Sequence, residues 1–167
     1  MWRFCFVLSD FSVNFASIMK IDLLSEAEAT LLKEIVARSA SIVVCCHKSP
    51  DGDAIGSSLA WVEYLRSNGK QATVIVPDAY PDFLQWLPNT EKILRYDKHQ
   101  QQADDIIERA DLIFCLDFNA TSRLDLMQQV IDNSAASKVL IDHHLNPDID
   151  TVLSVSHPEM SSTAEMV

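Results

Sequence analysis

Short apolar runs rich in β-branched residues alternate with helical patterns from residue 22 to the end of the chain. The apolar runs predict strands at residues 41–46, 72–76, 111–116, 137–141 and 151–155. Helical spacing of apolar residues predicts helices over 22–40, 54–68, 101–109 and about 121–133. Apolar strands separated by helices are typical of a parallel sheet that is covered on both sides. The sequence therefore predicts an α/β fold, with a mostly parallel five-stranded sheet and helices on both faces.

Local signals mark the ends of several of these elements. Ser25 followed by Glu28 forms a predicted capping box at the start of the first helix. Gly69 suits the C-terminal end of the second helix. Residues 80–87 predict a short helix, the segment around Ile93 and Leu94 a small edge strand, and residues 161–167 the beginning of a helix.

The composition indicates a globular domain and argues against some classes of function. The 167 residues are 48% hydrophobic and 22% charged, which is typical of one globular domain with a core of its own. The net charge of −11 argues against a generic nucleic-acid binder, which needs basic residues to neutralise phosphates. Bound cations would still let such a chain hold phosphate esters. Cys45, Cys46 and Cys115 lie in apolar runs and are predicted to be buried thiols of a reducing, cytoplasmic compartment.

Residues 1–18 differ from the rest of the chain in being apolar and aromatic. Asp10 interrupts the run and Arg3 is its only positive charge, so a signal peptide is the weaker alternative. The run is too short and too polar to span a bilayer, and we expect no membrane association. We predict that residues 1–18 are a non-native or disordered extension and that the natural start is Met19.

Acidic and histidine residues follow three of the predicted strands. They are His47, Asp51 and Asp53 after the first strand, Asp117 after the third, and Asp142, His143 and His144 at the end of the fourth. Because the carboxyl ends of parallel strands lie along one edge of a sheet, these side chains should converge. Carboxylate and imidazole groups suit Mn²⁺ or Mg²⁺, and the absence of a thiolate argues against structural zinc.

Each of these features alone has a plain alternative. A Pro-Asp-Gly-Asp loop is often only a turn, an Asp after a strand often caps the next helix, and a His pair can be a surface feature. Their occurrence together at three strand ends favours a metal site.

Four segments, in this order, resemble the motifs of the DHH-family phosphoesterases. Residues 47–57 resemble the first motif, Asp117 in CLDFN the second, Asp142-His143-His144 the third, and residues 161–165 the opening of the fourth. The resemblance covers about residues 20–167 and is greatest to the bacterial enzymes that degrade very short RNAs and dephosphorylate 3′-phosphoadenosine 5′-phosphate (pAp). It implies a Rossmann-like catalytic domain at residues 19–167.

The resemblance also implies roles for the individual residues. His47 and Asp51 would hold a first metal, Asp53 and His143 a second, and Asp117 would bridge the two. Asp142 would orient His143, and His144 would face the substrate phosphate or the leaving oxygen. Two cations roughly 3.5–4 Å apart activate water and neutralise the phosphate oxygens.

The implied activity is that of a hydrolase with two Mn²⁺ ions, for which Mg²⁺ or Co²⁺ are possible substitutes. It would cleave short oligoribonucleotides as a 3′-5′ exonuclease, dephosphorylate pAp, or both. A cyclic-dinucleotide phosphodiesterase and an exopolyphosphatase of the same family remain alternatives. A metal- or nucleotide-binding module without turnover is a further alternative from a different class.

The family pattern also predicts that the domain is incomplete at its C-terminal end and that a C-terminal substrate-binding domain is absent. We therefore expect little catalysis from these residues alone and an exposed sheet edge that favours self-association, for example into a homodimer.

Four further residues are candidates for substrate binding. Arg123 could neutralise substrate phosphate, and a salt bridge with a neighbouring carboxylate is an equal alternative. Ser161, Ser162 and Thr163 could contact phosphate, or they could simply cap the last helix. Asn119 is predicted to cap a helix and His157 to be structural. The aromatic residues Trp61, Tyr64, Phe83 and Trp86 follow apolar positions and are predicted to be core.

Overall fold

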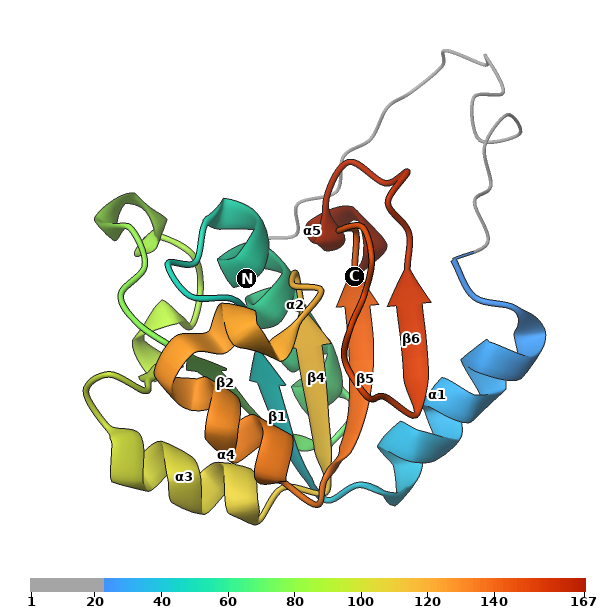
Figure 1. Ribbon diagram of the computed structural model, residues 1–167, viewed down its shortest axis with the longest axis horizontal. Coiled ribbons are helices and arrows are strands. Elements are labelled where there is room, and N and C mark those ends of the chain that lie inside the picture. Colours follow the sequence, from blue (N-terminus) through green and yellow to red (C-terminus); the bar gives the residue numbers. More distant parts are fainter. Residues whose placement is uncertain (1–22) are drawn as a thin grey trace.

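A parallel sheet forms the centre of the molecule (Figure 1). The computed structural model of the protein describes residues 23–167, so the predictions for residues 1–18 lie outside the described residues. Six strands pair in the order β3-β2-β1-β4-β5-β6, and every pair is parallel. The strands are β1 (Ser41–Cys45), β2 (Gln71–Val76), β3 (Leu94–Arg95), β4 (Leu112–Leu116), β5 (Ser137–Asp142) and β6 (Leu153–Ser156). The predicted α/β class is confirmed.

The predicted number of five strands is wrong by one, because the sheet also includes β3, the small edge strand that was predicted around Ile93 and Leu94 but not counted among the five. β3 has two residues and pairs with β2 only through Ile75 with Leu94 and Val76 with Arg95. A segment this short is too brief to show an alternation of apolar and polar residues, so its sequence does not say that it joins the main sheet. Pairing with the neighbouring strand, and not its own pattern, makes it a strand.

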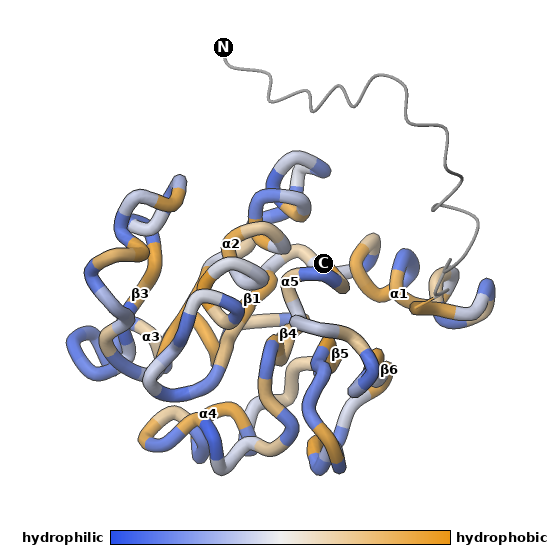
Figure 2. Tube along the Cα trace, turned by 90° about the horizontal axis from the view of Figure 1, so that it is seen from above, coloured by the Kyte–Doolittle hydropathy of each residue, from blue (hydrophilic) through white to orange (hydrophobic). Residues whose placement is uncertain are grey.

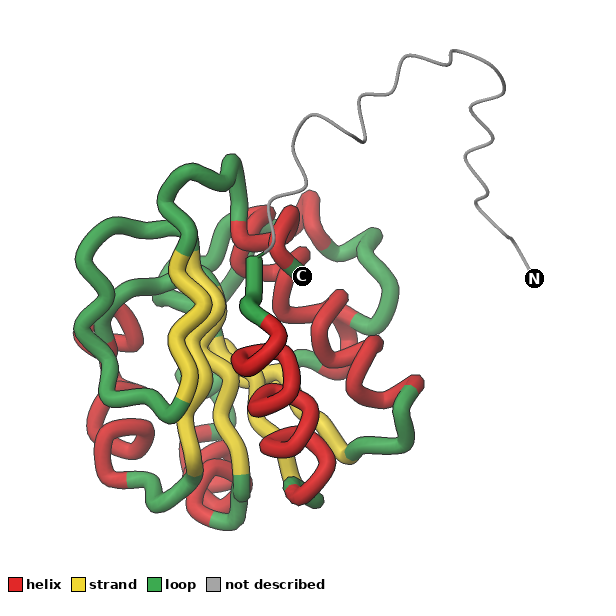
Figure 3. Tube along the Cα trace, turned by 90° about the vertical axis from the view of Figure 1, so that its right-hand side faces the viewer, coloured by secondary structure: helices red, strands yellow, loops and turns green. Residues whose placement is uncertain are grey.

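Helices connect the strands and lie on both faces of the sheet, as Figure 3 shows. The α-helices are α1 (Glu26–Arg38), α2 (Gly52–Ser67), α3 (Gln100–Glu108), α4 (Gln128–Asn133) and α5 (Thr163–Met166). Short 3₁₀ helices are η2 (Asp82–Leu84), η3 (Thr90–Lys92) and η4 (Thr121–Met127). Among the described residues, no helix combines the length and the apolar composition that crossing a bilayer requires.

A hydrophobic core lies on each face of the sheet, between the strands and the helices that cover them. Because alternate strand residues face opposite sides, Val44 and Phe114 belong to the core under α1 and α2. Val43 and Ile113 belong to the core under α3 and α4. Figure 2 shows α4 on one side of the strands and α1 and α2 on the other. Each fully buried aliphatic or aromatic side chain stabilises the fold by roughly 1.5–3 kcal/mol.

The predicted helix ends are largely confirmed. Ser25 and Glu28 form the capping box of α1, and Gly69, with a φ of 77°, follows the end of α2. The helix predicted over 121–133 is instead a 3₁₀ helix, η4, followed by α4, and η4 is interrupted at Asp125, which has a φ of 51° and a ψ of −124°. This conformation is not helical, so the chain bends there.

The predicted aromatic core is confirmed only for Trp61, which is buried. Tyr64, Phe83 and Trp86 are 57%, 72% and 77% exposed, so the prediction is wrong for these three residues. The prediction was based on apolar spacing. Phe83 and Trp86 lie in the connection between β2 and β3, and in this segment Leu84 and Leu87 pack into the core instead. The predicted burial of Cys45, Cys46 and Cys115 is confirmed.

Candidate metal centre

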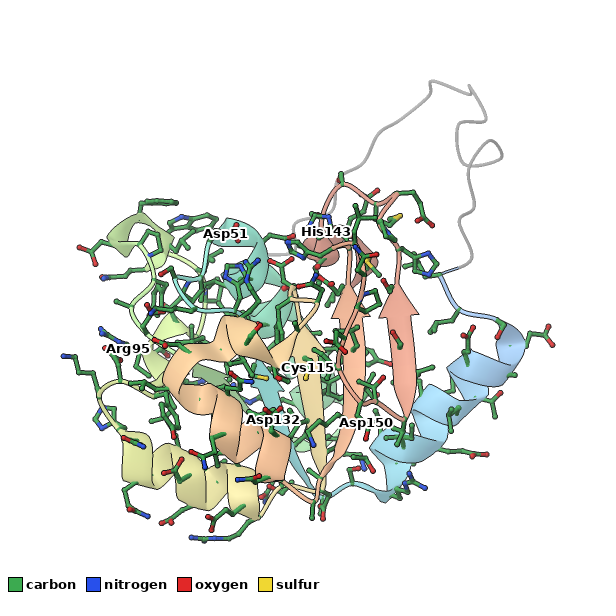
Figure 4. All side chains as sticks on the ribbon, viewed as in Figure 1. Asp51, Arg95, Cys115, Asp132, His143 and Asp150 are labelled. Carbon is green, nitrogen blue, oxygen red and sulfur yellow. The ribbon has the colours of Figure 1, made fainter. Side chains whose placement is uncertain are left out.

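The carboxyl ends of β1, β4 and β5 place the predicted metal ligands along one rim of the sheet. In Figure 4, Asp51 and His143 lie at this rim, whereas Asp132 and Asp150 lie towards the opposite end of the strands. The convergence follows from the parallel pairing of β4 with both β1 and β5.

His47 follows β1 and is buried, with 7% of its surface exposed. Its Nδ1 lies 2.8 Å from the carbonyl oxygen of Lys48, which assigns the ring proton to Nδ1. Nε2 then carries a lone pair and lies 3.6 Å from Asp117 Oδ2. A histidine that donates through one nitrogen to a carbonyl and presents the other is the usual arrangement of a metal ligand.

Asp51 and Asp53 lie at the start of α2. Asp51 is the N-cap of this helix, and its Oδ1 accepts hydrogen bonds from the amides of Asp53 at 2.9 Å and Ala54 at 3.0 Å. Its second oxygen, Oδ2, has no such helix-capping contact among the described residues. The predicted alternative of capping is thus confirmed for Asp51, but it occupies only one of the two oxygens.

Asp117 lies at the centre of the rim and is 2% exposed. It has a φ of 63°, a left-handed conformation that Asp tolerates better than most residues and that ends β4 abruptly. Oδ1 accepts a hydrogen bond of 2.9 Å from Thr163 Oγ1 and lies 3.5 Å from His143 Nε2, while Oδ2 faces His47. The two oxygens of this one carboxylate therefore face two different histidines.

The two histidines that follow β5 differ in their surroundings. His143 Nδ1 lies 3.3 Å from the carbonyl oxygen of Met160, and its Nε2 lies 3.6 Å from Asp53 Oδ2. His144 Nδ1 lies 2.7 Å from Asp142 Oδ1. The prediction that Asp142 orients His143 is therefore wrong, because Asp142 contacts His144 and the partner of His143 Nδ1 is the carbonyl oxygen of Met160.

Two groups of side chains at this rim could each hold a cation, and they share Asp117. One group is His47, Asp51 and Asp117, and the other is Asp117, His143 and His144; within each group the ligand atoms lie within 4.8 Å of one another. Asp53 contacts the second group through His143. Oxygen and imidazole donors of this kind fit Mn²⁺ or Mg²⁺, and close carboxylates at this rim would otherwise repel one another.

The charged groups of the site shift one another's pKa values. Interaction with Asp117 raises the pKa of His47 above its usual value, although burial opposes the rise. Burial acts to raise the pKa of Asp117, but contacts with His47 and Thr163 outweigh it and hold this pKa below its usual value. Burial raises the pKa of Asp53, and the negative charge of Asp117 adds to the rise. Opposite shifts of neighbouring carboxyl groups are typical of functional sites.

Asp53 also holds the start of α5 through hydrogen bonds to backbone amides. Its Oδ2 accepts a hydrogen bond of 2.8 Å from the amide of Thr163, and its Oδ1 one of 2.7 Å from Ala164. These bonds attach the start of α5 to the rim. An ionised carboxylate has about four lone-pair positions, so the two amide bonds leave capacity for a cation.

The residues predicted for substrate binding differ in their exposure and in their hydrogen-bond partners. Arg123 is exposed, and its carbonyl oxygen accepts a hydrogen bond of 2.8 Å from the amide of Lys48, which fixes its backbone beside His47. Ser162 caps α5 by accepting from the amide of Glu165 at 3.1 Å, and Ser161 Oγ donates to Glu165 Oε2 at 2.7 Å. Capping and local contacts are therefore what the structure shows for both serines.

Several residues that support the site were not identified from the sequence. Asp78, just after β2, accepts a hydrogen bond of 2.6 Å from the amide of Ser49 and fixes the loop that carries Asp51. Lys48 forms an ion pair of 2.6 Å with Asp125, at the kink inside η4. Asp78 could have been found, because it is one more carboxylate at the end of a predicted strand. The ion pair depends on the non-helical conformation of Asp125, and the sequence pattern of this segment did not predict that conformation.

Comparison with known proteins agrees with this geometry. A model of the DHH family, N-terminal domain, matches residues 41–167. The cyclic-di-AMP phosphodiesterase GdpP of Bacillus subtilis is 28% identical over 146 residues, which cover 81% of this chain and 22% of that protein. The bifunctional oligoribonuclease and PAP phosphatase NrnA of Thermus thermophilus is 34% identical over 128 residues, which cover 75% of this chain and 35% of that protein.

A solved structure shares both fold and sequence. The crystal structure of an exopolyphosphatase-related protein from Bacteroides fragilis superposes with a TM-score of 0.85 and 45% identity. The match covers 89% of this chain and 43% of that one. The chain thus spans less than half the length of each of these three relatives. The resemblance drawn from the sequence motifs is confirmed.

Proposed function

The chain belongs to the DHH family, and on that premise we propose that it carries the catalytic site of a manganese-dependent phosphoesterase. We propose that this enzyme hydrolyses short oligoribonucleotides from the 3′ end, pAp, or both. The observation that supports the proposal most is Asp117, one buried carboxylate shared by two groups of metal-type ligands. A single structural cation would need only one such group.

Each residue of the rim has a role in this proposal. His47 and Asp51 would hold one cation, Asp53 and His143 would hold the other, and Asp117 would be shared between them. Two cations held in this way would activate water and neutralise the oxygens of a phosphate during in-line displacement. The carbonyl contacts of the two Nδ1 atoms orient the rings so that His47 Nε2 and His143 Nε2 face the rim, where each could bind a cation.

His144 acts on the substrate and not on the cations. Its Nδ1 is the nitrogen nearer to Asp117, at 3.9 Å, and this atom is already engaged by Asp142. Nε2 is then the atom that faces the substrate phosphate or the leaving oxygen. Arg123, whose backbone is fixed beside His47, supplies positive charge for the same phosphate.

The choice of substrate rests on the relatives. NrnA is named as an oligoribonuclease and PAP phosphatase and GdpP as a cyclic-di-AMP phosphodiesterase, so both act on nucleotide phosphate esters. A cyclic dinucleotide is accordingly the second candidate substrate. A polyphosphate is the third, from the name of the Bacteroides fragilis protein. A cytoplasmic location and a homodimer are parts of the same proposal.

The test is a substrate panel with the complete gene product. Short RNA, pAp, a cyclic dinucleotide and polyphosphate are offered with Mn²⁺, Mg²⁺ or Co²⁺, and release of nucleotide or phosphate is measured. We expect hydrolysis of short RNA or pAp, fastest with Mn²⁺, and none by the Asp117→Asn variant. Failure to cleave any of the four substrates, with metal bound, would instead support a binding module without turnover.

A further inference from the structure

We propose that Lys48 and Asp125 are positioning residues of the metal centre, and that their ion pair holds η4 against the loop that carries His47 and Asp51. This inference rests on the proposed function and deepens it, because it gives the pair an effect on one cation through His47. Lys48 Nζ lies 2.6 Å from Asp125 Oδ2, and the two residues are 77 positions apart in the sequence. The pair therefore joins two segments that are distant along the chain.

Lys48 contacts its surroundings through three polar groups. Its amide donates to the carbonyl oxygen of Arg123 at 2.8 Å, and its own carbonyl oxygen lies 2.8 Å from His47 Nδ1. Its ammonium group pairs with Asp125, which lies two residues beyond Arg123 in η4. Lys48 thus orients the ring of His47 with its carbonyl group, and it holds η4 with both its amide and its side chain.

The backbone of Asp125 is strained. Its φ of 51° and ψ of −124° interrupt η4, although Leu124 and Met127 of the same segment are fully buried. Such a conformation costs free energy for a residue other than glycine. Strained residues persist where the surrounding structure holds them in place, and they gather at functional sites. At Asp125 the strained residue is also the one whose carboxylate contacts Lys48.

The exposure of the ion pair argues against a role in stability. The side chains of Lys48 and Asp125 are 49% and 45% exposed. An ion pair this open to water contributes less to the free energy of folding than a strained backbone costs. Net stability therefore does not explain the arrangement, whereas a defined placement of η4 relative to His47 does.

The loop that follows β1 is also held from its other side. The amide of Ser49, which has a φ of 52°, donates to Asp78 Oδ1 at 2.6 Å. Asp78 follows β2 and η4 follows β4, and β1 lies between these two strands in the sheet. Since Asp78 keeps its contact when the ion pair is removed, we expect the loop to shift and the fold to remain.

Mn²⁺ titration of the complete gene product, with the Tm of the metal-free protein measured alongside, tests the proposal without any substrate. Lys48→Met keeps the amide and the carbonyl group and removes the charge. Asp125→Gly removes the carboxylate and permits the positive φ without strain. We expect each variant to bind Mn²⁺ about tenfold more weakly at the site of His47 and Asp51, as for the loss of other groups that orient a metal ligand.

Stability separates a positioning role from a structural one. The metal-free Tm of Asp125→Gly should be at least that of the wild type, because strain is relieved while Mn²⁺ binding is weakened. Lys48→Arg keeps the positive charge and should retain most of the Mn²⁺ affinity. The double variant Lys48→Met/Asp125→Gly should be no worse than the more affected single variant, because the two side chains act as a unit.

Arg95→Met is the matched control, since it removes another exposed ion pair, that of Arg95 with Asp97 at 2.7 Å. Arg95 belongs to β3, which β2 separates from β1, and in Figure 4 it lies apart from Asp51 and His143. This variant should change neither Mn²⁺ affinity nor turnover. With the substrate that the wild type cleaves best, kcat/KM should fall about tenfold in Lys48→Met and Asp125→Gly.

Three outcomes would overturn the proposal. One is unchanged Mn²⁺ affinity in both Lys48→Met and Asp125→Gly. Another is a fall of the metal-free Tm in Asp125→Gly, which would make the pair a structural contact. The third is a raised KM in Lys48→Met with wild-type behaviour of Asp125→Gly, which would mean that Lys48 binds the substrate phosphate directly.

The titration also separates this proposal from the proposed function. A wild type that binds Mn²⁺ and hydrolyses none of the four substrates would contradict the proposed function, while weaker Mn²⁺ binding by the two variants would still support the role of the pair. A wild type that binds no Mn²⁺ would refute both.

Discussion

Asp117 combines burial, a positive φ and contacts to His47, His143 and Thr163 in a single residue. We predict that Asp117→Ala removes the shared ligand and leaves two sets of donors without a common carboxylate. The expected result is loss of one or both bound Mn²⁺ ions and a fall in kcat of at least about a hundredfold. Metal content by calorimetric titration and turnover by the complete gene product check this. Near-wild-type turnover would contradict the assignment.

His143 and His144 are neighbours whose substitution should have different effects. Loss of the His143 Nε2, which faces Asp53 and Asp117, should weaken Mn²⁺ binding. Loss of His144, whose Nδ1 is engaged by Asp142, should leave the Mn²⁺ titration near normal and lower turnover. His143→Ala and His144→Ala are compared by titration and by kinetics.

Asp142→Asn is the control for this pair, because it weakens only the contact to His144. It should reproduce the His144→Ala pattern in milder form. Equal loss of Mn²⁺ binding in the two alanine variants would show that the roles are assigned wrongly.

At the scale of elements, α5 is joined to the rim by Thr163, which is fully buried and donates from Oγ1 to Asp117 Oδ1 at 2.9 Å. Thr163→Val keeps the shape but removes the donor. We expect a loss of about 1.5–3 kcal/mol in the free energy of unfolding, as for a buried hydrogen bond to a charged group. Thr163→Ser should restore most of it. Denaturant unfolding of the metal-free protein measures the difference, and an unchanged midpoint for the valine variant would argue against the contact.

A second link joins the start of α1 to the segment after β6. His157 Nε2 lies 2.8 Å from the carbonyl oxygen of Leu23, and its Nδ1 lies 2.8 Å from Glu159 Oε1. Both partners are acceptors, so the protonated ring satisfies both. The contact with Glu159 raises the pKa of His157 above its usual value of 6.5, although partial burial opposes the rise.

This shift predicts a pH dependence of stability with a definite sign. A raised pKa in the folded state stabilises the fold fully below the unfolded pKa, and the contribution is lost as pH rises through the folded pKa. We expect the difference in Tm between wild type and His157→Gln to be larger at pH 6 than at pH 8.5. Thermal unfolding of both proteins at the two values of pH provides the measurement. A difference that grows with pH would contradict the protonated link.

The sequence predicted the elements whose pattern is local and missed those that depend on neighbours. The alternation of apolar runs and helices predicted β1, β4 and β5, and their parallel pairing followed from the helical connections. The edge strand predicted around Ile93 and Leu94 is present as β3, but it was not counted in the sheet because only its pairing with β2 makes it part of the sheet. Asn119 was expected to cap a helix but donates through Nδ2 to the Leu145 carbonyl oxygen at 2.7 Å, a contact 26 residues away in sequence.

The same limit applies to the site. Ligand types and strand ends were sufficient to predict that His47, Asp51 and Asp117 meet. The partner of Asp142 was not predictable, because the order of residues alone does not say which of the two following histidines its side chain reaches. The exposure of Phe83 and Trp86 was missed for a related reason: in a 3₁₀-type turn the inner positions go to Leu84 and Leu87, and apolar composition alone does not say which pair is inner.

At the scale of the whole molecule, an acidic chain of net charge −11 carries Asp51, Asp53 and Asp117 at one rim. Cations that bind there should stabilise the fold, since they bind only the assembled site. At a Mn²⁺ concentration about 100 times Kd, the gain is about 2.7 kcal/mol per site. For a domain of this size, we expect a rise in Tm of roughly 5–10 °C.

Two Asp→Asn variants make this prediction specific. Asp51→Asn keeps the N-cap of α2, because Asn caps as well as Asp, but removes the charge. It should leave the Tm of the metal-free protein nearly unchanged and lose much of the rise with Mn²⁺. Asp132→Asn, at the opposite end of the strands in Figure 4, should retain the full rise. An equal response of both variants would mean that Mn²⁺ acts through general charge screening.

The central claim is that one carboxylate, Asp117, joins two cations at the carboxyl ends of β1, β4 and β5. Electron paramagnetic resonance of the complete gene product, titrated with Mn²⁺, tests this most directly, because two Mn²⁺ ions about 3.5–4 Å apart are magnetically coupled. We predict a coupled spectrum at two Mn²⁺ per chain for the wild type and its disappearance in Asp117→Ala. A spectrum of isolated Mn²⁺ ions at every ratio in the wild type would contradict the account.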